Sequence, residues 1–245
     1  MIILALDSAL SSCSAAVIKD GKIISELFED RMRGQAERLV PMCLEVCDKA
    51  DVTFEDLTAI AVTRGPGAFT GVRIGLATAK GLALALGLPL VAVTTLEAVA
   101  QNLAEAMGRP QNKLPVGRMA IALDARRSEV YLQVFDITGR DDMPILRPVS
   151  EPAAVPLMKI SDYLDEKVTH LVGTGADLVK PYLAREFIRK IAFPAAKNQP
   201  NAGRVGLIAA KRLKAGEIPD NIAPLYLRAP DAVAANPVTY AFQNQ

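Results

Sequence analysis

One segment of the chain has a glycine spacing that could cradle an anion: Gly65 to Gly75, with the sequence GPGAFTGVRIG. Glycine permits positive φ angles and close approach of the backbone to a ligand. The segment lies between an expected strand, 59–63, and a long expected helix, and a helix N-terminus offers free N–H groups and partial positive charge. The first interpretation is therefore a phosphate-binding turn.

The helix that follows this turn favours a packing role instead. Thr70 is the expected N-cap, and between Gly71 and Leu86 only Arg73 and Lys80 are charged. Those two residues share one helical face, while small residues recur every four positions on the others. A helix that is apolar nearly all round is buried on more than one side. Two interpretations stay open: a central helix of one large core, or a helix whose second face packs on another chain.

Other reactive side chains do not assemble into a catalytic or metal site. His170 is the only histidine, so a metal site built from histidines cannot form. Cys43 and Cys47 share the apolar face of an expected helix, and Cys13 lies in an expected strand, which indicates small buried side chains. No nucleophile and base stand together in the sequence. We therefore expect no catalytic residue, no metal and no cofactor.

Composition indicates a globular protein of two lobes. The chain has 245 residues, 51% of them hydrophobic, and a net charge of +1, so no global charge draws it to nucleic acid or membrane. The N-terminus runs directly into a strand pattern, and Arg73, Lys80 and Pro89 interrupt the longest apolar stretch. Three cysteines cannot form an even disulfide framework. We expect a cytoplasmic protein without a membrane segment.

Hydrophobic periodicity predicts alternating strands and helices. The first part has expected strands at 2–7, 13–19, 22–29, 59–63 and 90–93, and helices at 35–50, 70–86 and 95–107. Pro41 implies that the first helix begins near Val40 or kinks there. The second part has expected strands at 119–124, 129–136 and 171–174, and helices at 161–166, 176–190 and 205–213. The pattern predicts two α/β lobes with related mixed sheets.

Prolines and polar residues mark the limits of the two lobes. A linker is expected at 108–117, so residues 1–108 form the first lobe and residues 118–228 the second. The last helix of the second lobe could pack back on the first lobe. The tail at 229–245 contains Pro230 and Pro237 and is expected to be weakly ordered.

Seven short segments of the chain, together with the strand and helix pattern above, resemble the bacterial TsaB (YeaZ) family. The matching pieces cover most of residues 1–228: ILALDSALSSCSAAV near the start, QAERLVPM at 35–42, GPGAFTGVRIGLATAKGLA at 65–83, TTLEAVAQ at 94–101, LDARRSEVY at 123–131, GTGA at 173–176 and LYLR at 225–228. The glycine-rich block with its helix is the most specific of them. The resemblance implies an α/β protein with the two-lobed actin-like ATPase (ASKHA) fold, degenerate, with mixed five-stranded sheets and helices.

The resemblance also implies a function. Family members act with the paralogue TsaD, which transfers a threonylcarbamoyl group from an adenylate to the adenosine after the tRNA anticodon. The chain would be a non-catalytic activating or scaffold subunit that binds TsaD, is joined by the small ATPase TsaE and meets tRNA through the complex. In isolation it would form a homodimer through the same helical face. The implied interface residues are Gly71, Arg73, Ile74, Gly75, Thr78, Ala79 and Leu82 of the long helix, with Leu39 and Met42 before it.

The resemblance further indicates where a nucleotide would bind in an active member of the fold. Its phosphate loop follows the first strand, where this chain has Asp7, Ser8 and Ser11, and a second loop corresponds to Asp124-Ala125-Arg126-Arg127-Ser128. Both loops lack the glycine that close backbone approach to phosphate requires. We therefore expect a degenerate nucleotide loop at Asp7, Ser8 and Ser11 and no intrinsic hydrolysis of ATP.

The catalytic paralogue also has a helix with a metal-binding His-x-x-x-His pair. The corresponding residues here are Gln35 and Leu39, which cannot replace imidazole as ligands of iron or zinc. Two alternatives stay open beside the accessory subunit. One is an independent ATP-dependent enzyme or a peptidase of the actin-like fold, against which the missing glycines and histidines argue. The other is a homodimeric structural protein, which copurification with a TsaD-like partner would separate from the first hypothesis.

Overall fold

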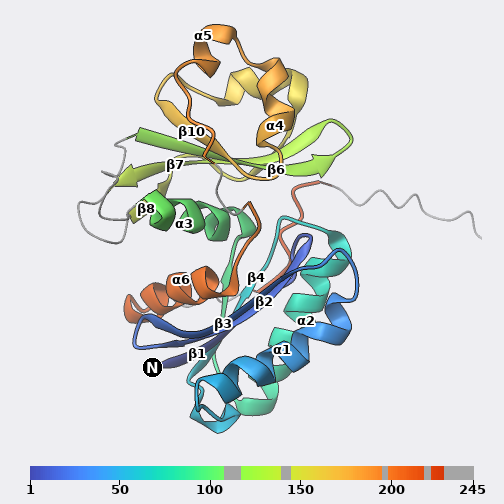
Figure 1. The fold of residues 1–245 in the computed structure, drawn as a ribbon, viewed down its shortest axis with the longest axis vertical. Helices are drawn as coiled ribbons and strands as arrows, with labels where there is room; N and C mark the ends of the chain where they lie inside the picture. Colours follow the sequence, from blue (N-terminus) through green and yellow to red (C-terminus); the bar gives the residue numbers. More distant parts are fainter. Residues whose placement is uncertain (108–116, 139–144, 195–197, 218–221, 229–245) are drawn as a thin grey trace, which may run out of the picture.

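The computed structural model describes residues 1–107, 117–138, 145–194, 198–217 and 222–228. Within these residues the chain forms two sheets, with helices outside each sheet and two helices between them (Figure 1). Each sheet is mixed and has five strands, as predicted. The expected tail at 229–245 and nearly all of the expected linker at 108–117 lie outside the described residues.

The first sheet is built from the N-terminal part of the chain. Its strands are β1 (Ile2–Asp7), β2 (Ser12–Lys19), β3 (Lys22–Asp30), β4 (Ala59–Thr63) and β5 (Leu90–Val93), in the order β3-β2-β1-β4-β5. β1 is antiparallel to β2, whereas β1, β4 and β5 are parallel, so their carboxyl ends lie at one edge. Two helices, α1 (Gln35–Lys49) and α2 (Phe69–Leu86), cover the outer face and bury Leu4, Leu6 and Val62 (Figure 1). A short 3-10 helix, η1 (Phe54–Asp56), precedes β4.

The second sheet follows from residue 117 onwards. Its strands are β6 (Gly117–Arg126), β7 (Glu129–Thr138), β8 (Ile145–Pro148), β9 (Ala153–Pro156) and β10 (Val168–Val172). The order is β10-β6-β7-β8, and β9 also pairs with β7. The outer face is covered by η2 (Leu157–Tyr163), α4 (Ala176–Val179), η3 (Lys180–Tyr182) and α5 (Arg185–Ile188), which enclose a second apolar core.

Two helices fill the layer between the sheets. α6 (Ala202–Lys214) packs Val205 and Ala209 on the first sheet, although it comes late in the chain. α3 (Thr95–Met107) packs Leu96 and Val99 against the second sheet, although it comes early. Arg212 of α6 forms an ion pair with Glu97 of α3 and donates to the carbonyl of Ala92 at 2.7 Å. Each lobe therefore receives its inner helix from the part of the chain that builds the other sheet.

Most predicted elements are confirmed, and the exceptions have physical reasons. α1 runs through Pro41 from Gln35, so the expectation that it starts near Val40 is wrong. α2 is capped by Ala68 and not by Thr70, because the turn before it is already fixed by a bond from the Ala68 N–H to the carbonyl of Ala9 at 2.8 Å.

The predictions for the second lobe were less accurate. The helix predicted at 176–190 is broken into α4, η3 and α5, where Pro181 interrupts it because proline has no N–H to donate. A 3-10 helix at Leu157–Tyr163 replaces the helix predicted at 161–166. β8 and β9 were not predicted from the sequence: both are only four residues long, and β9 is held by its pairing with β7.

The glycine-rich turn before α2 is filled by the chain itself. A Cβ atom on Gly67 would lie 2.2 Å from the carbonyl oxygen of Ala9, and one on Gly71 would lie 2.2 Å from that of Ser8. The hydroxyl of Ser8 donates to the carbonyl of Gly71 at 2.9 Å. The glycines thus let α2 dock on the β1–β2 loop, which corrects the first interpretation of this turn as a phosphate cradle.

This contact predicts opposite effects of alanine at two glycines of α2. Gly71→Ala places a methyl group against backbone that cannot rotate away, and we expect it to lower the free energy of unfolding by roughly 2 kcal/mol. Gly81→Ala enters open space on the same helix and should raise it by about 0.5–1 kcal/mol. Urea unfolding of both variants measures the difference. Equal effects of the two substitutions would contradict the docking described here.

Candidate functional site

The loop after β1 uses its polar groups internally. Ser8 is fully buried and is occupied by its bond to Gly71, whereas Ser11 is exposed. The backbone of Ala9 is bonded to α2. The structure therefore does not bring the three residues of the expected degenerate nucleotide loop to one surface. Asp7 and Ser8 are buried, and only Ser11 lines the cleft.

Asp7 is a fully buried carboxyl group at the end of β1. One of its oxygens, Oδ1, accepts hydrogen bonds from the Ala9 N–H at 3.1 Å and from the Thr63 hydroxyl. The other, Oδ2, has no hydrogen-bond partner among the described residues. Burial raises the pKa of Asp7 from 3.8 to about 6, and the bonds from Thr63 and Ala9 offset only part of that effect. The group is enclosed and is not placed to act on a substrate.

The corresponding loop in the second lobe is a tight turn between β6 and β7. Arg126, Arg127 and Ser128 all have positive φ angles, between 53° and 63°. Asp124 accepts a hydrogen bond from the Arg126 N–H at 2.8 Å and forms an ion pair with its guanidinium at 3.3 Å. Glu129 pairs instead with Arg228, at 3.2 Å. This carboxylate is therefore used to hold the C-terminal part of the chain.

The glycine turn at 173–176 also serves packing. A Cβ atom on Gly173 would lie 2.1 Å from the carbonyl oxygen of Ala122, and one on Gly175 would lie 2.8 Å from a methyl group of Val130. The hydroxyl of Thr174 accepts a hydrogen bond from the Asp124 N–H at 3.0 Å. The turn fastens α4 to β6.

A cleft of about 550 Å³ lies where these loops meet. Its lining residues come from both lobes and from residues 222–228, which we call the C-terminal strap; they include Ser11, Phe69, Asp124, Tyr131, Tyr226 and Arg228. The strap is anchored to the first lobe by the Leu225 N–H, which donates to the Arg64 carbonyl at 2.8 Å. A volume of this size suits a small molecule, and on its wall the Arg126 N–H already donates to Asp124.

The three cysteine thiols and the imidazole of His170 are all buried in the structure. Cys13, Cys43 and Cys47 are free and buried, and burial raises the pKa of the three thiols to about 11, 12 and 11. Burial also lowers the pKa of His170, whose Nδ1 lies 2.8 Å from the Thr169 hydroxyl. Among the residues that the structure describes, no three His, Cys, Asp or Glu side chains are grouped closely enough to hold a metal ion.

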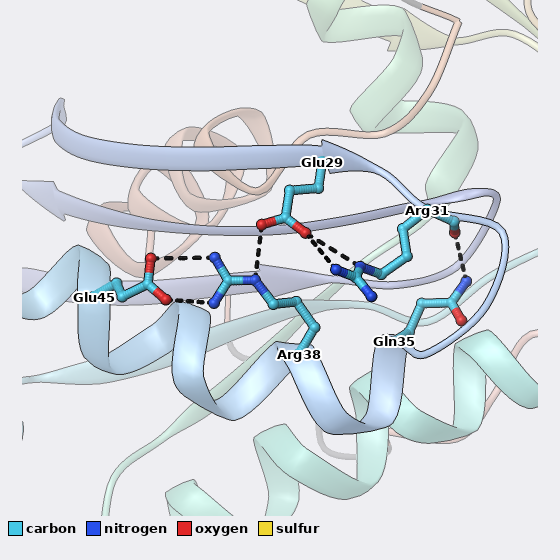
Figure 2. Close-up of polar contacts among 5 residues, drawn as sticks. All are labelled: Glu29, Arg31, Gln35, Arg38 and Glu45. Atoms are coloured by element: carbon cyan, nitrogen blue, oxygen red, sulfur yellow. Dashed lines mark hydrogen bonds and ion pairs between the residues drawn. The ribbon is translucent and has the colours of Figure 1, made fainter.

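The start of α1, which includes Gln35, holds an ion-pair network with the end of β3 (Figure 2). Gln35 donates its amide to the Arg31 carbonyl at 2.9 Å and so closes the β3–α1 turn. Arg38 bonds Glu45 within α1 and Glu29 of β3, the latter at 2.7 Å; Arg31 bonds the other oxygen of Glu29. Hydrogen bonds from Arg38 and then Arg31 hold the pKa of Glu29 below its usual value. The network ties α1 to an edge strand.

Five of the expected interface residues are not at the surface. On α2, the buried face toward the first sheet carries Gly71, Gly75 and Ala79. On α1, the inner face carries Leu39 and Met42, which are fully buried. The expectation that these side chains meet a second chain is therefore wrong in this structure. What approaches the glycines is the chain's own loop, since the atoms nearest to Gly71 and Gly75 belong to Ser8.

The opposite face of α2 is open. Arg73 is exposed, and Ile74, Thr78 and Leu82 are half-buried; their place in an interface stays a prediction. Leu84 is 85% exposed, which is unusual for a leucine. The spacing of Arg73, Lys80 and Leu84 could have marked this face from the sequence, because the two charged residues identify its solvent side.

Small and apolar residues on α1 and α2 form what we call the outer apolar face: Val40, Leu44, Ala77, Gly81, Leu84 and Ala85. The two helices lie beside each other on the outside of the first sheet (Figure 1). By length and composition α2 is also the one described helix that could cross a membrane, a test that a helix packed in a core passes as well.

The buried Asp7 predicts a specific pH dependence of stability. Its pKa is higher in the folded chain than in the unfolded one, so the folded state binds more protons between about pH 4 and pH 6, and stability falls as pH rises through that window. Asp7→Asn removes this effect. The unfolding free energy of the variant, relative to the unmodified chain, should rise by roughly 2–3 kcal/mol from pH 4 to pH 7. Urea unfolding at several pH values tests this, and a constant difference would refute it.

A family model and several sequence relatives of this chain carry names from tRNA threonylcarbamoyladenosine biosynthesis. Residues 27–235 match the family model described as TsaD, tRNA N6-adenosine threonylcarbamoyltransferase. A TsaB protein, named for tRNA threonylcarbamoyladenosine biosynthesis, from Escherichia coli K12 is 40% identical over 131 residues, a match that spans about half of each protein, 54% of this chain and 53% of the relative. TsaB of Buchnera aphidicola subsp. Schizaphis graminum is 30% identical over 200 residues, 80% of this chain and 90% of the relative.

Solved structures agree with the sequence relatives. YeaZ from Pseudomonas aeruginosa is 32% identical, with a TM-score of 0.77 over 92% of this chain and 99% of its own. A second structure, described as an uncharacterized protein with similarity to peptidase YEAZ from the same organism, has a TM-score of 0.78 at 32% identity over 93% of this chain and 99% of its own. The two-lobed α/β fold expected from the resemblance is thereby confirmed, and the chain belongs to the TsaB (YeaZ) family.

Proposed function

We propose that this chain is an accessory subunit in the biosynthesis of N6-threonylcarbamoyladenosine in tRNA, and that it acts by binding and activating a TsaD-like catalytic subunit. The names of its relatives place TsaB proteins in that pathway. The accessory role is favoured by the side chains of the degenerate loops, because Ser8 and Asp7 are buried and already bonded within the chain.

The observation that carries the proposal is the outer apolar face. Leu84 and Leu44 expose 85% and 53% of their surface, and Val40 exposes 43%. The small residues Ala77, Gly81 and Ala85 around them would allow close approach of another helix. Exposed apolar surface of this kind marks a protein–protein contact when it is contiguous.

A TsaD-like chain is the occupant that the comparisons favour. The TsaD family model matches residues 27–235, a range that includes both α1 and α2. Related chains can pair through corresponding faces in the manner of a two-fold dimer. The same argument supports a homodimer when the partner is absent, and it makes the two assemblies mutually exclusive. A TsaE-like ATPase and tRNA would join through the assembled complex, in the cytoplasm.

A charge placed on the outer apolar face should abolish partner binding. Leu84→Glu keeps the fold, because the side chain is exposed, but it would bury an unpaired carboxylate in the interface. We expect the affinity for the TsaD-like subunit to fall at least about tenfold, with a parallel loss of tRNA threonylcarbamoylation in the reconstituted reaction. Titration calorimetry and modified-nucleoside analysis measure both effects.

A matched control is available in the second lobe. Met158 is 87% exposed and belongs to η2, which packs on the second lobe's own core, so Met158→Glu makes a similar change away from α2. It should leave both binding and modification unchanged. If modification proceeds equally well without this chain, or if Leu84→Glu and Met158→Glu behave alike, the proposed function is wrong.

A further inference from the structure

Arg73, in the first turns of α2, is held in one position by two aromatic rings. Its guanidinium carbon lies 3.5 Å from the ring centre of Phe69 and 5.8 Å from that of Tyr226. The two rings stack on each other at 5.6 Å with an angle of 28° between their planes. Arg73 Nε donates to the Tyr226 hydroxyl at 2.8 Å. An arginine held in this way has lost most of its rotamer freedom before any partner binds.

The terminal nitrogens of Arg73 remain available. Its Nε is used by Tyr226, and within the described residues no carboxylate pairs with its Nη1 or Nη2. The hydroxyl of Tyr226 accepts this bond and can still donate its own proton. Phe69 and Tyr226 are 49% and 44% exposed, so the group faces solvent. Guanidinium and phenol donors together suit one carboxylate.

Tyr226 reaches this group from the far end of the sequence through the C-terminal strap. Leu225 is bonded to Arg64 of the first lobe, whereas Arg228 bonds the Ala125 carbonyl at 3.3 Å and Glu129 at 3.2 Å in the second lobe. The strap is therefore fixed on both sides of Tyr226. The position of the phenol ring depends on both lobes being correctly placed.

We infer that Phe69, Arg73 and Tyr226 form a preorganised anchor that binds a carboxylate side chain of the TsaD-like subunit. The inference rests on the proposed function and adds the kind of contact that fixes the partner. Arg73 and Ala77 are four residues apart on α2, so the anchor continues the outer apolar face toward the helix N-terminus. Arginine and tyrosine are among the residue types that are enriched where a few side chains dominate binding energy. Tyr226 is the positioning residue of this anchor, and Arg73 makes the contact.

The test uses the full chain and the TsaD-like subunit, with affinity measured by titration calorimetry at about 50 and 300 mM NaCl. Arg73→Gln should weaken binding about tenfold and reduce its salt dependence, because the lost contact is ionic. Arg73→Lys should restore only part of the affinity, since an ammonium group neither forks nor stacks as guanidinium does. Tyr226→Phe, which keeps the ring and loses the acceptor, should weaken binding less than Tyr226→Ala.

Arg185→Gln is the matched control. Arg185 is an exposed arginine of α5, at the opposite end of the molecule from α2 (Figure 1), and its replacement should change the affinity less than about twofold. Thermal unfolding of every variant confirms that the fold is kept, and Tyr226→Phe keeps the test valid if Tyr226→Ala unfolds.

Three results would overturn the anchor while the proposed function stands. These are equal affinities of Arg73→Gln and Arg185→Gln, a weakened Arg73→Gln whose salt dependence is unchanged, and Tyr226 variants that bind as tightly as the unmodified chain. Failure of the unmodified chain itself to bind the catalytic subunit would instead refute the proposed function, and the anchor with it.

Discussion

The contact between the β1–β2 loop and the start of α2 is the constraint on which the rest of the structure depends. Gly67 and Gly71 have no side chains, so the backbone of Ser8 and Ala9 lies directly against them. The Ala68 N–H donates to the Ala9 carbonyl, and the Ser8 hydroxyl donates to the Gly71 carbonyl. This docking fixes which side of α2 faces the first sheet and which side stays open. It also fills the space beside the loop, so the same glycines that suggest a phosphate cradle close it. The turn before α2 therefore holds the chain's own β1–β2 loop, and the far side of α2 stays exposed.

Burial of Asp7 follows from that docking. The carboxyl group stands at the end of β1 and is enclosed, with one oxygen unbonded within the described residues. Its raised pKa means that keeping it costs stability at neutral pH. The second loop has also changed its use, since Asp124 holds its own turn and Glu129 holds Arg228. In this structure the polar groups of both loops make contacts within the chain.

The two lobes are held together at several points, and this fixes the surface that a partner would meet. α3 comes from the N-terminal part of the chain but packs on the second sheet, and α6 comes from the C-terminal part but packs on the first sheet. The ion pair between Arg212 and Glu97 joins the two helices. The C-terminal strap adds a connection on the cleft side and delivers Tyr226 to Arg73. A face held in one arrangement in this way loses little conformational freedom when a partner binds, which favours affinity.

The sequence by itself determined the elements of the first lobe, the burial of the three cysteines and the lack of a histidine site, because these depend on local periodicity and on residue type. It also located α2 as the unusual helix. Arg73 and Lys80 mark the solvent side of α2 in the sequence, but small residues recur on both faces, and only the structure shows that Ser8 packs against Gly71 and Gly75. The interrupted helix at 176–190, the short strands β8 and β9, and the meeting of Arg73 with Tyr226 across 153 positions were decided by tertiary structure. Contacts between residues so far apart leave no local pattern, since they form only after both lobes have folded around their shared helices.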